Sequence, residues 1–550
     1  MTRSIPPHSI LPAILLAVIC ALGPEDRGLA DEGHTLPDGV QRGRAIYHAG
    51  EGRPPIDLLL SSSDLTLPAT TFPCSNCHGG RGEGPEAGGV APPPIRWRDL
   101  LRPATSPLTG VDRPAHTAES VLRAITEGVD PTGRPLHPGM PRYTLTEEQG
   151  TDLVSYLRIL GSDLDLDPGL TAERVRLGCF LPLSGPRAER GEAVRRALEA
   201  FVANSNGRGG VYGRTLEVVY ADSGETEESA VEAARRLIEE DEVFALLACF
   251  VPVGAEDLYL LVEEAGVPLV APLTIPPRPQ DPPLRTAFQL LSGHYEQARV
   301  LVEFAAVAPE LPKAGYSLVF IDDGVHREAR DGVVDQIAVF GGALAAELSY
   351  PIGELAAEEV VALLAERKTE AVLMFGVPGD IIALAVAMDE AGVAWPLLTT
   401  GSTLGRAAFS LPETVARGTY VTYPSGQPTQ EELQWVLDLA AEQSLVIDHP
   451  AQQGPALAAA RIFVEGLKRS GKRVSRDSWT EAIEGLKHFR TGLAPPVSFG
   501  LNQRTGALGA SILRIEPQAE SFLPVSDWIT PRSKDRTGAR ALGASREEGE

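Results

Sequence analysis

The sequence has 550 residues, which is more than one ordinary hydrophobic core supports, so two or three domains are expected. Its 74 acidic residues outnumber the 49 basic ones and give a formal net charge of -25. This balance argues against nucleic acid or anionic lipid as a partner, because phosphate binding requires an excess of Lys and Arg.

The first 30 residues have the order of a secretory signal peptide. Arg3 precedes an apolar run from Ile10 to Leu22, and a polar stretch then ends in Gly28-Leu29-Ala30. Because Pro12 interrupts this short run, it is a poor membrane span, and we expect cleavage after Ala30, export to the periplasm and no stable membrane insertion. An uncleaved anchor is the alternative.

Four stretches of different texture follow the signal. Residues 36–162 are rich in Gly and Pro with few helical patterns, and residues 163–173 form a short linker. In residues 174–530 strands alternate with amphipathic helices. Residues 531–550 are charged and lack apolar periodicity, so they are expected to be a disordered tail.

The run Cys74-Ser75-Asn76-Cys77-His78 has the C-x-x-C-H spacing of covalent haem attachment. Two thiols at this spacing can add to the two vinyl groups of one haem, and the adjacent imidazole then reaches the iron. Half of a zinc ribbon is the alternative, but it needs a second Cys or Cys/His pair, and no Cys follows before Cys179. We therefore predict one covalent haem c, attached through Cys74 and Cys77, with His78 as an iron ligand.

The second iron ligand follows by elimination. Of the 4 Met residues, only Met140 lies between the signal and the linker, in the Pro-rich loop 137–143. We predict that Met140 is the axial ligand, and His137 and His116 are the alternative ligands. Met140 could instead have a purely structural role and fill the hydrophobic core. With both axial positions filled, outer-sphere electron transfer is expected rather than catalysis.

The N-terminal region resembles the class I cytochrome c family. The matching features are a helix over 43–49, the attachment motif, the run Pro92-Pro93-Pro94, the Met140 loop and a closing helix after a capping box at 146–149. The resemblance implies an all-α fold, His78 and Met140 as axial ligands, and a carbonyl near Pro93 that accepts a hydrogen bond from the His78 ring. An insert at 51–73 departs from the family pattern and could cover the haem edge.

Strands and helices alternate in the second region. Expected strands lie at 175–183, 216–222, 244–249, 316–323, 344–348, 371–375 and 396–400, with amphipathic helices between them. Such an order predicts parallel sheets joined by right-handed crossovers, in two doubly wound lobes. A ligand would then bind in a cleft at the carboxyl ends of the strands.

This region resembles the type I periplasmic binding proteins, which are related to the branched-chain amino-acid binders of ABC transporters. The matching residues are 182–186 (PLSGP), 206–216 (NGRGGVYGRTL), Asp222, 266–268 (GVP) and 321–323 (IDD). The resemblance implies a two-lobed α/β fold and hinge closure around a small ligand. The expected architecture is thus an all-α cytochrome c domain followed by a two-lobed α/β periplasmic-binding-protein type I fold.

The amino-acid pocket of that family is not reproduced in this sequence. Phe250-Val251-Pro252 stands where the family places small hydroxylic residues, and Val325-His326 displaces an expected Tyr. Free amino acids are therefore disfavoured as ligands, because a buried unpaired carboxylate is costly. Topology alone gives these cleft candidates, each of which could equally be structural: Ser184, Phe250, Thr274, Asp323, His326 and Tyr423.

Cys179 and Cys249 lie near the ends of the first and third expected strands, which are neighbours in a doubly wound sheet. Two interpretations remain open for them. They could form a strained and easily reduced disulfide, or they could be two buried thiols that pack as small hydrophobic side chains.

These features predict a periplasmic electron carrier with a fused small-molecule-binding module, and not an enzyme. The redox partner would be a periplasmic dehydrogenase or another cytochrome, and the family resemblance suggests a quinoprotein alcohol dehydrogenase. The alternative is a solute-binding or sensing protein of an ABC transporter with an accessory haem domain. A peroxidase with an opened haem is a third hypothesis, which the predicted Met140 ligand and the single attachment motif disfavour.

Overall fold

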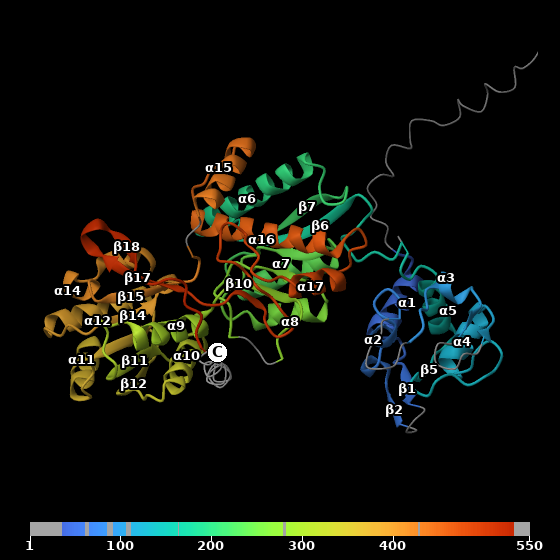
Figure 1. Ribbon diagram of the computed structural model, residues 1–550, viewed down its shortest axis with the longest axis horizontal. Coiled ribbons are helices and arrows are strands. Elements are labelled where there is room, and N and C mark those ends of the chain that lie inside the picture. The colour runs from blue at the N-terminus through green and yellow to red at the C-terminus, as the bar shows by residue number, and fades with distance from the viewer. Residues whose placement is uncertain are drawn as a thin grey trace, which may run out of the picture. The chain divides into compact units, whose positions relative to one another are not determined.

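The computed structural model describes residues 36–60, 65–84, 92–105, 112–162, 164–278, 282–426 and 429–532. The predicted signal peptide, and the predicted tail beyond residue 532, lie outside these ranges. The chain divides into two compact units, Met1–Leu166 and Asp167–Glu550 (Figure 1). In the part of the chain that is described, no helix has the length and apolar character needed to span a bilayer.

A pair of helices organises the first unit. Helix α1 (Asp38–Ala49) packs along helix α5 (Glu147–Leu157), and the two approach closely at Gly43, where an added Cβ would lie 2.0 Å from the backbone oxygen of Asp152. Helix α5 begins at a capping box formed by Thr146 and Gln149. Three shorter helices complete the helical part: α2 (Cys74–His78), α3 (Trp97–Leu100) and α4 (Ala118–Thr126).

The first unit also contains a small antiparallel sheet, which an all-α cytochrome c fold does not include. Strand β1 (Asp57–Leu60) pairs with β2 (Leu65–Pro68) on one side and with β5 (Arg142–Thr144) on the other. Strands β1 and β2 and the short 3-10 helix η1 (Ala69–Thr71) come from the insert at 51–73. The insert contributes Ile56, Leu58 and Ala69 to the core of the domain. A second strand pair joins β3 (Ala104–Thr105) to β4 (Asp112–Arg113).

The first lobe of the second unit is a six-stranded sheet in the order β16-β10-β9-β8-β6-β7, and all its neighbours are parallel. Its strands are β6 (Arg174–Leu181), β7 (Thr215–Asp222), β8 (Ala245–Leu247), β9 (Leu269–Val270), β10 (Ala287–Leu291) and β16 (Thr505–Ala507). Its helices are α6 (Ala188–Gly207), α7 (Glu227–Glu239), α8 (Glu256–Glu264), α15 (Gln430–Gln443), α16 (Pro450–Ser470) and α17 (Arg476–Glu484). Helix α6 packs on α16 and α7 packs on α8, as in a doubly wound sheet.

The second lobe is a seven-stranded sheet in the order β12-β11-β13-β14-β15-β17-β18. The first five strands are parallel, and the last two are antiparallel. Its strands are β11 (Tyr316–Ile321), β12 (Ala346–Tyr350), β13 (Ala371–Phe375), β14 (Leu397–Thr400), β15 (Thr419–Tyr423), β17 (Ser511–Glu516) and β18 (Ser521–Pro524). Its helical segments are α9 (His294–Val307), α10 (Gly324–Val339), α11 (Ala357–Glu366), α12 (Pro378–Glu390), α13 (Gly401–Leu404), η2 (Gly405–Ser410), α14 (Glu413–Ala416) and η3 (Pro517–Ala519).

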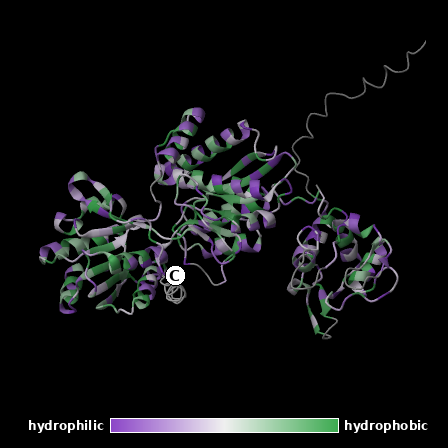
Figure 2. Cartoon of the chain, viewed as in Figure 1, coloured by the Kyte–Doolittle hydropathy of each residue, from purple (hydrophilic) through white to green (hydrophobic). Residues whose placement is uncertain are grey.

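The strands of both lobes are mainly hydrophobic (Figure 2), which is expected for parallel strands covered by helices on both faces. The chain passes between the lobes after β10, after β15 and after β16. Ser292 links two of these crossings, because its hydroxyl donates to the Ala507 carbonyl at 3.0 Å and accepts from the Gly509 amide at 2.8 Å. These crossings join the two lobes that the alternating pattern of the sequence predicted.

Candidate haem site and candidate solute cleft

The attachment motif forms the one-turn helix α2, which ends at Gly79 with a φ of 79°. Cys74 and His78 are four positions apart and Cys77 lies between them, so all three side chains lie near one face of this turn. Cys74 is half-buried, Cys77 is exposed and His78 is buried. Two thiols and an imidazole are thus presented together, as covalent attachment of one haem requires.

A backbone carbonyl orients the His78 ring. Its Nδ1 lies 3.1 Å from the Pro93 oxygen, which leaves Nε2 as the atom available to a metal. Burial lowers the pKa of His78, so the imidazole is held in the neutral form that ligation needs. Gly84 allows the proline run to approach the motif, because a Cβ there would lie 2.3 Å from the Pro92 oxygen.

Two buried tyrosines hold the chain on either side of the motif. The Tyr47 hydroxyl donates to the Gly79 carbonyl at 2.6 Å, and the Tyr143 hydroxyl donates to the Phe72 carbonyl at 2.6 Å. Burial raises the pKa of both phenols, so each remains a neutral hydrogen-bond donor. No sequence motif marks Tyr47 or Tyr143, because each binds a carbonyl that lies far away in the sequence.

Met140 and the two histidine alternatives lie in different surroundings. Met140 is half-buried and packs against the hydrophobic core that Cys74 also contacts. His116 is buried with its Nδ1 3.1 Å from the Ser120 hydroxyl, and burial lowers its pKa to about 4. His137 is exposed, and its Nδ1 accepts from the Gly139 amide at 3.1 Å. A thioether in the same core as the motif therefore fits a haem site, and Met140 stays the predicted ligand.

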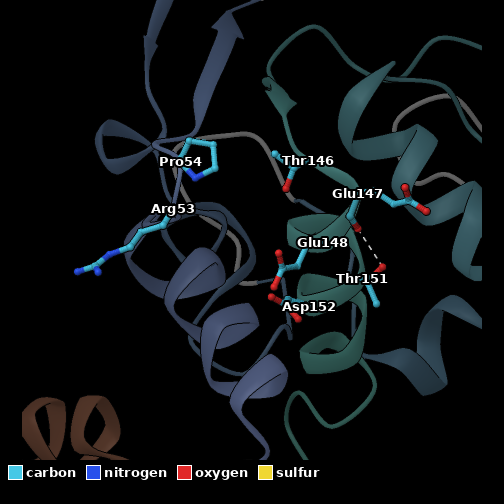
Figure 3. Close-up of a pocket in the computed structure, with 7 residues that line it drawn as sticks. All are labelled: Arg53, Pro54, Thr146, Glu147, Glu148, Thr151 and Asp152. Atoms are coloured by element: carbon cyan, nitrogen blue, oxygen red, sulfur yellow. Dashed lines mark hydrogen bonds between the residues drawn. The ribbon is translucent and has the colours of Figure 1, made fainter.

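An open pocket lies elsewhere in the first unit (Figure 3) and contains none of the predicted haem residues. Its lining residues are Arg53, Pro54, Thr146, Glu147, Glu148, Thr151 and Asp152. The carboxylates of Glu148 and Asp152 already pair with Arg42, at 3.0 and 2.7 Å. The pocket marks the place where the insert at 51–73 meets the start of α5.

The last residues of the first unit include Asp165, which the sequence analysis assigned to the linker. Asp165 is buried and accepts from the Tyr156 hydroxyl at 2.8 Å and from the Gly161 amide at 2.8 Å. His48 Nε2 is also 2.8 Å from the Tyr156 hydroxyl. The start of the predicted linker is thus bonded to the helices of the first unit.

In the second unit, the six predicted cleft residues lie at or just after the carboxyl ends of parallel strands. Ser184 follows β6, Phe250 follows β8 and Thr274 follows β9 in the first lobe. In the second lobe Asp323 and His326 follow β11, and Tyr423 ends β15. This is the edge at which open α/β sheets bind ligands.

In the first lobe, the aromatic ring of Phe250 lies beside an arginine whose charge is paired. The Arg187 guanidinium lies 5.3 Å from the centroid of the Phe250 ring and pairs with Glu225 at 2.5 Å. The Ser184 hydroxyl bonds to Asp222 and, as the largest cause, lowers the pKa of that carboxyl. Arg187 is therefore not a free cation for a ligand carboxylate, which agrees with the loss of the amino-acid pocket from the sequence.

Two strained residues precede the first-lobe candidates. Ala248 and Ala271 have φ values of 50° and 47°, a left-handed conformation that non-glycine residues rarely adopt. Both are buried, and they lie just before Phe250 and Leu273, which form a parallel bridge between their strands. Such strain is typical of functional loops. No sequence signal marks it, because alanine is not a turn residue.

On the second-lobe side, Asp323 and His326 bind one another. The Asp323 carboxylate caps helix α10 by accepting from the His326 amide at 2.8 Å, and it also contacts His326 Nδ1 at 2.8 Å. The His326 ring lies 6.2 Å, centroid to centroid, from the ring of His294 at the start of α9. His294 is 2% exposed, and neither ring nitrogen has a hydrogen-bond partner. No motif in the sequence marks His294.

Cys179 lies in β6, and Cys249 lies two residues after the end of the neighbouring strand β8; both are fully buried. Both are free thiols in the structure, so no disulfide joins them there. Their sulfur atoms face the Ala248 and Gly178 carbonyls, at 3.7 and 3.8 Å. Burial, together with the neighbouring Cys249, raises the pKa of the Cys179 thiol.

The chain thus combines a small helical unit that carries a C-x-x-C-H helix with a two-lobed α/β unit. Comparison with known families agrees: the model described as periplasmic binding protein matches residues 174–519, and the cytochrome c model matches residues 69–161. Because the first match covers more than half of the sequence, the chain belongs to the periplasmic binding protein family. The predicted family resemblances and fold class are thereby confirmed, and this family membership indicates a periplasmic location.

Curated relatives match only part of their own length. Leu/Ile/Val-binding protein homolog 2 of Brucella abortus is 29% identical over 111 residues, which are 20% of this chain and 29% of that relative. Two solved structures share the fold at 19% identity. An ABC transporter substrate-binding protein from Sphaerobacter thermophilus has a TM-score of 0.53 and covers 65% of this chain and 98% of its own. A branched-chain amino acid ABC transporter protein from Thermus thermophilus with bound valine has a TM-score of 0.52 and covers 67% and 99%.

Proposed function

We propose that this protein is a periplasmic one-haem electron carrier fused to a module that binds a small molecule. The observation that carries the proposal is the C-x-x-C-H helix, whose His78 is oriented by the Pro93 carbonyl, in a chain that belongs to the periplasmic binding protein family. The cytochrome c domain suggests electron transfer, and the binding-protein domain suggests a ligand.

In this proposal Cys74 and Cys77 hold the haem through thioethers, while His78 and Met140 are its axial ligands. The bound haem supplies a one-electron iron couple, which His/Met ligation shifts to a higher potential than bis-His ligation would. The residues of the chain supply position and shielding. The Pro93 carbonyl keeps a proton on His78 Nδ1, and the buried core around Met140 limits the access of water.

The proposed electron donor is a periplasmic dehydrogenase of the quinoprotein alcohol type or another cytochrome, and its support is the resemblance of the cytochrome domain. Stopped-flow mixing of the oxidised holoprotein with such a dehydrogenase and its alcohol tests the donor. We expect the haem to become reduced within the mixing experiment. Haem that stays oxidised, while a chemical reductant still reduces it, would exclude this class of donor.

The proposed ligand is a small molecule that does not depend on a carboxylate anchor. Its support is the surroundings of Phe250, where Glu225 already neutralises the charge of Arg187. A thermal-melt screen against alcohols, aldehydes, carboxylates and amino acids tests this. A ligand at a hundred times its dissociation constant should stabilise the second unit by roughly 2.7 kcal/mol. Hits confined to amino acids would contradict the proposed ligand class, and Phe250→Ala is the variant that should abolish a true hit.

The second candidate function is a solute-binding or sensing protein of an ABC transporter with an accessory haem domain. It is favoured by the larger share of the chain that matches the binding-protein family. The two functions differ in the haem. If a screened ligand binds equally to oxidised, reduced and Cys77→Ala protein, and no donor reduces the haem, this second candidate replaces the first.

A further inference from the structure

We propose that the insert at residues 51–73, which we call the brace, holds the Met140 loop in its iron-binding position, with Tyr143 as the positioning residue. The proposal rests on the proposed function, because it takes Met140 as the axial ligand. It goes beyond that function by assigning a role to a segment that departs from the cytochrome c pattern.

The backbone of the brace pairs with the strand that leaves the Met140 loop. Strand β5 begins at Arg142, two residues after Met140, and lies antiparallel to β1 with Leu58 opposite Tyr143 and Leu59 opposite Arg142. Leu58 is fully buried, so this pairing belongs to the core. A ladder so close to Met140 fixes the direction in which the loop leaves the haem site.

The Tyr143 side chain connects three parts of the site. Its hydroxyl donates to the carbonyl of Phe72, at the end of the brace, at 2.6 Å. The Tyr143 ring belongs to the hydrophobic core against which Cys74, at the start of the attachment helix, also packs. Tyr143 is 7% exposed, and its position in β5 is set by the pairing with the brace. One buried residue thus couples Met140, the brace and an attachment cysteine.

A second contact fixes the other end of the brace. Gln149 Nε2 donates to the Pro54 carbonyl at 2.7 Å, while Gln149 Oε1 accepts from the Thr146 amide at 2.9 Å in the capping box of α5. Gln149 is 5% exposed. Figure 3 shows Pro54 opposite Thr146 across the pocket between these two segments. The chain on the C-terminal side of Met140 is therefore tied to both ends of the brace.

Arg142 closes the turn of the Met140 loop. The Arg142 guanidinium donates to the Met140 carbonyl and covers Gly128, where an added Cβ would lie 1.6 Å from Nε. What the brace adds is a fixed position of that turn relative to Cys74.

The proposal predicts how readily an external ligand displaces Met140 from the ferric iron. We would titrate the purified holoprotein with imidazole and follow the weak red charge-transfer band that is diagnostic of Met-ligated ferric haem. Tyr143→Phe keeps the buried ring and removes only the hydroxyl. Gln149→Glu keeps the acceptor for the Thr146 amide and removes the donor to Pro54. Leu65→Ala is the control, since Leu65 is an exposed brace residue in β2 that pairs with Leu60 of β1 and not with β5.

We expect the Tyr143 and Gln149 variants to bind imidazole about five-fold more tightly than the wild type, which corresponds to about 1 kcal/mol. Covalent haem content and the Leu65→Ala control should not change. Wild-type imidazole affinity in both variants, with the band intact, would overturn the role of the brace. A wild-type holoprotein without the band, and with the spectrum of Met140→Ala, would instead overturn the Met140 ligand itself.

Discussion

The two units of this chain differ in whether their buried polar groups have hydrogen-bond partners. In the haem unit, the buried tyrosine hydroxyls and the His78 Nδ1 have partners, mostly backbone carbonyls. Among the residues that the structure describes, the buried side-chain atoms without a partner all lie in the binding unit: Tyr220 Oη, Gln289 Oε1, His294 Nδ1, His294 Nε2 and Thr399 Oγ1. Unpaired buried groups are rare and need an explanation.

This difference fits two kinds of site. An electron-transfer centre benefits from ligands that stay in place, and the haem unit fixes them through carbonyls on several segments. A binding cleft must exchange water for ligand and change its contacts on closure. Two of the residues with unpaired groups, Gln289 and His294, flank the crossing between the lobes after β10. Variants that affect one unit and leave the other unchanged test this comparison.

The largest effect is expected from the attachment motif. Replacement of both Cys74 and Cys77 by Ala should abolish covalent haem binding, since both thioethers are lost, while the second unit keeps its melting temperature because its core is separate. Haem staining of the denatured chain and a melt of the second unit measure the two effects. Cys179→Ala is the matched control, because Cys179 lies in the first lobe of the binding unit and should leave haem staining unchanged.

A core substitution in the binding unit should have the converse effect. Trp479 is fully buried, lies edge-on to Phe288 and donates from Nε1 to the Phe463 carbonyl at 3.1 Å. Trp479→Ala should destabilise the binding unit by about 3–5 kcal/mol, as truncation of a large buried aromatic side chain does. Denaturant unfolding followed by fluorescence measures the loss. An equal loss of the haem-unit transition would contradict the independence of the two cores.

The binding unit should also contain two opposed proton-linked effects at the start of α9. Burial lowers the pKa of His294 to about 4, beside His326 and Asp323, and raises that of Glu296 to about 7, near Arg299 and Glu328. Between pH 6.5 and 4 the unfolded chain protonates His294 first, so stability falls as the pH falls. Between pH 7 and 4.5 the folded chain protonates Glu296 first, so stability rises as the pH falls.

The two effects largely cancel in the wild type, and single substitutions should separate them. Glu296→Gln should lose about 3 kcal/mol of stability on acidification through this window, and His294→Gln should gain a similar amount. Melts of the binding unit across the range measure both slopes. If both variants keep the wild-type slope, the two groups do not titrate as their burial implies.

A smaller effect distinguishes the two interpretations of the buried thiols. In the holoprotein the haem consumes Cys74 and Cys77, so the free thiols of the described chain are Cys179 and Cys249. Ellman titration of the unfolded, unreduced holoprotein should therefore find two thiols per chain after signal cleavage. A count of zero would show a bridge across β6 and β8.

The sequence predicted those features whose signal is local. The C-x-x-C-H spacing lies within five residues. The strand predicted at 371–375 corresponds to β13, and the amphipathic helix expected between the strands at 216–222 and 244–249 corresponds to α7, because the apolar run or periodicity of each is continuous. The two-lobed fold followed from the same alternation. A site residue within a short local motif, such as His78, can therefore be assigned from the amino-acid sequence alone.

Features that depend on distant partners could not be predicted. Strand β1 has four residues and pairs with β5, which lies more than eighty positions later, so no short window contains both. The isolation of His294 likewise depends on which groups surround the start of α9, and not on its neighbours in sequence. The left-handed Ala248 is set by its sheet, since alanine has no preference for that conformation.

Spectroelectrochemical titration of the purified holoprotein tests the central claim most directly. We expect one covalent haem per chain, a single reversible one-electron transition, and the ferric Met-ligand band in the wild type but not in Met140→Ala. A chain that carries no covalent haem, or one whose reduced haem binds carbon monoxide without displacing a ligand, would contradict a closed electron-transfer site formed by His78 and Met140.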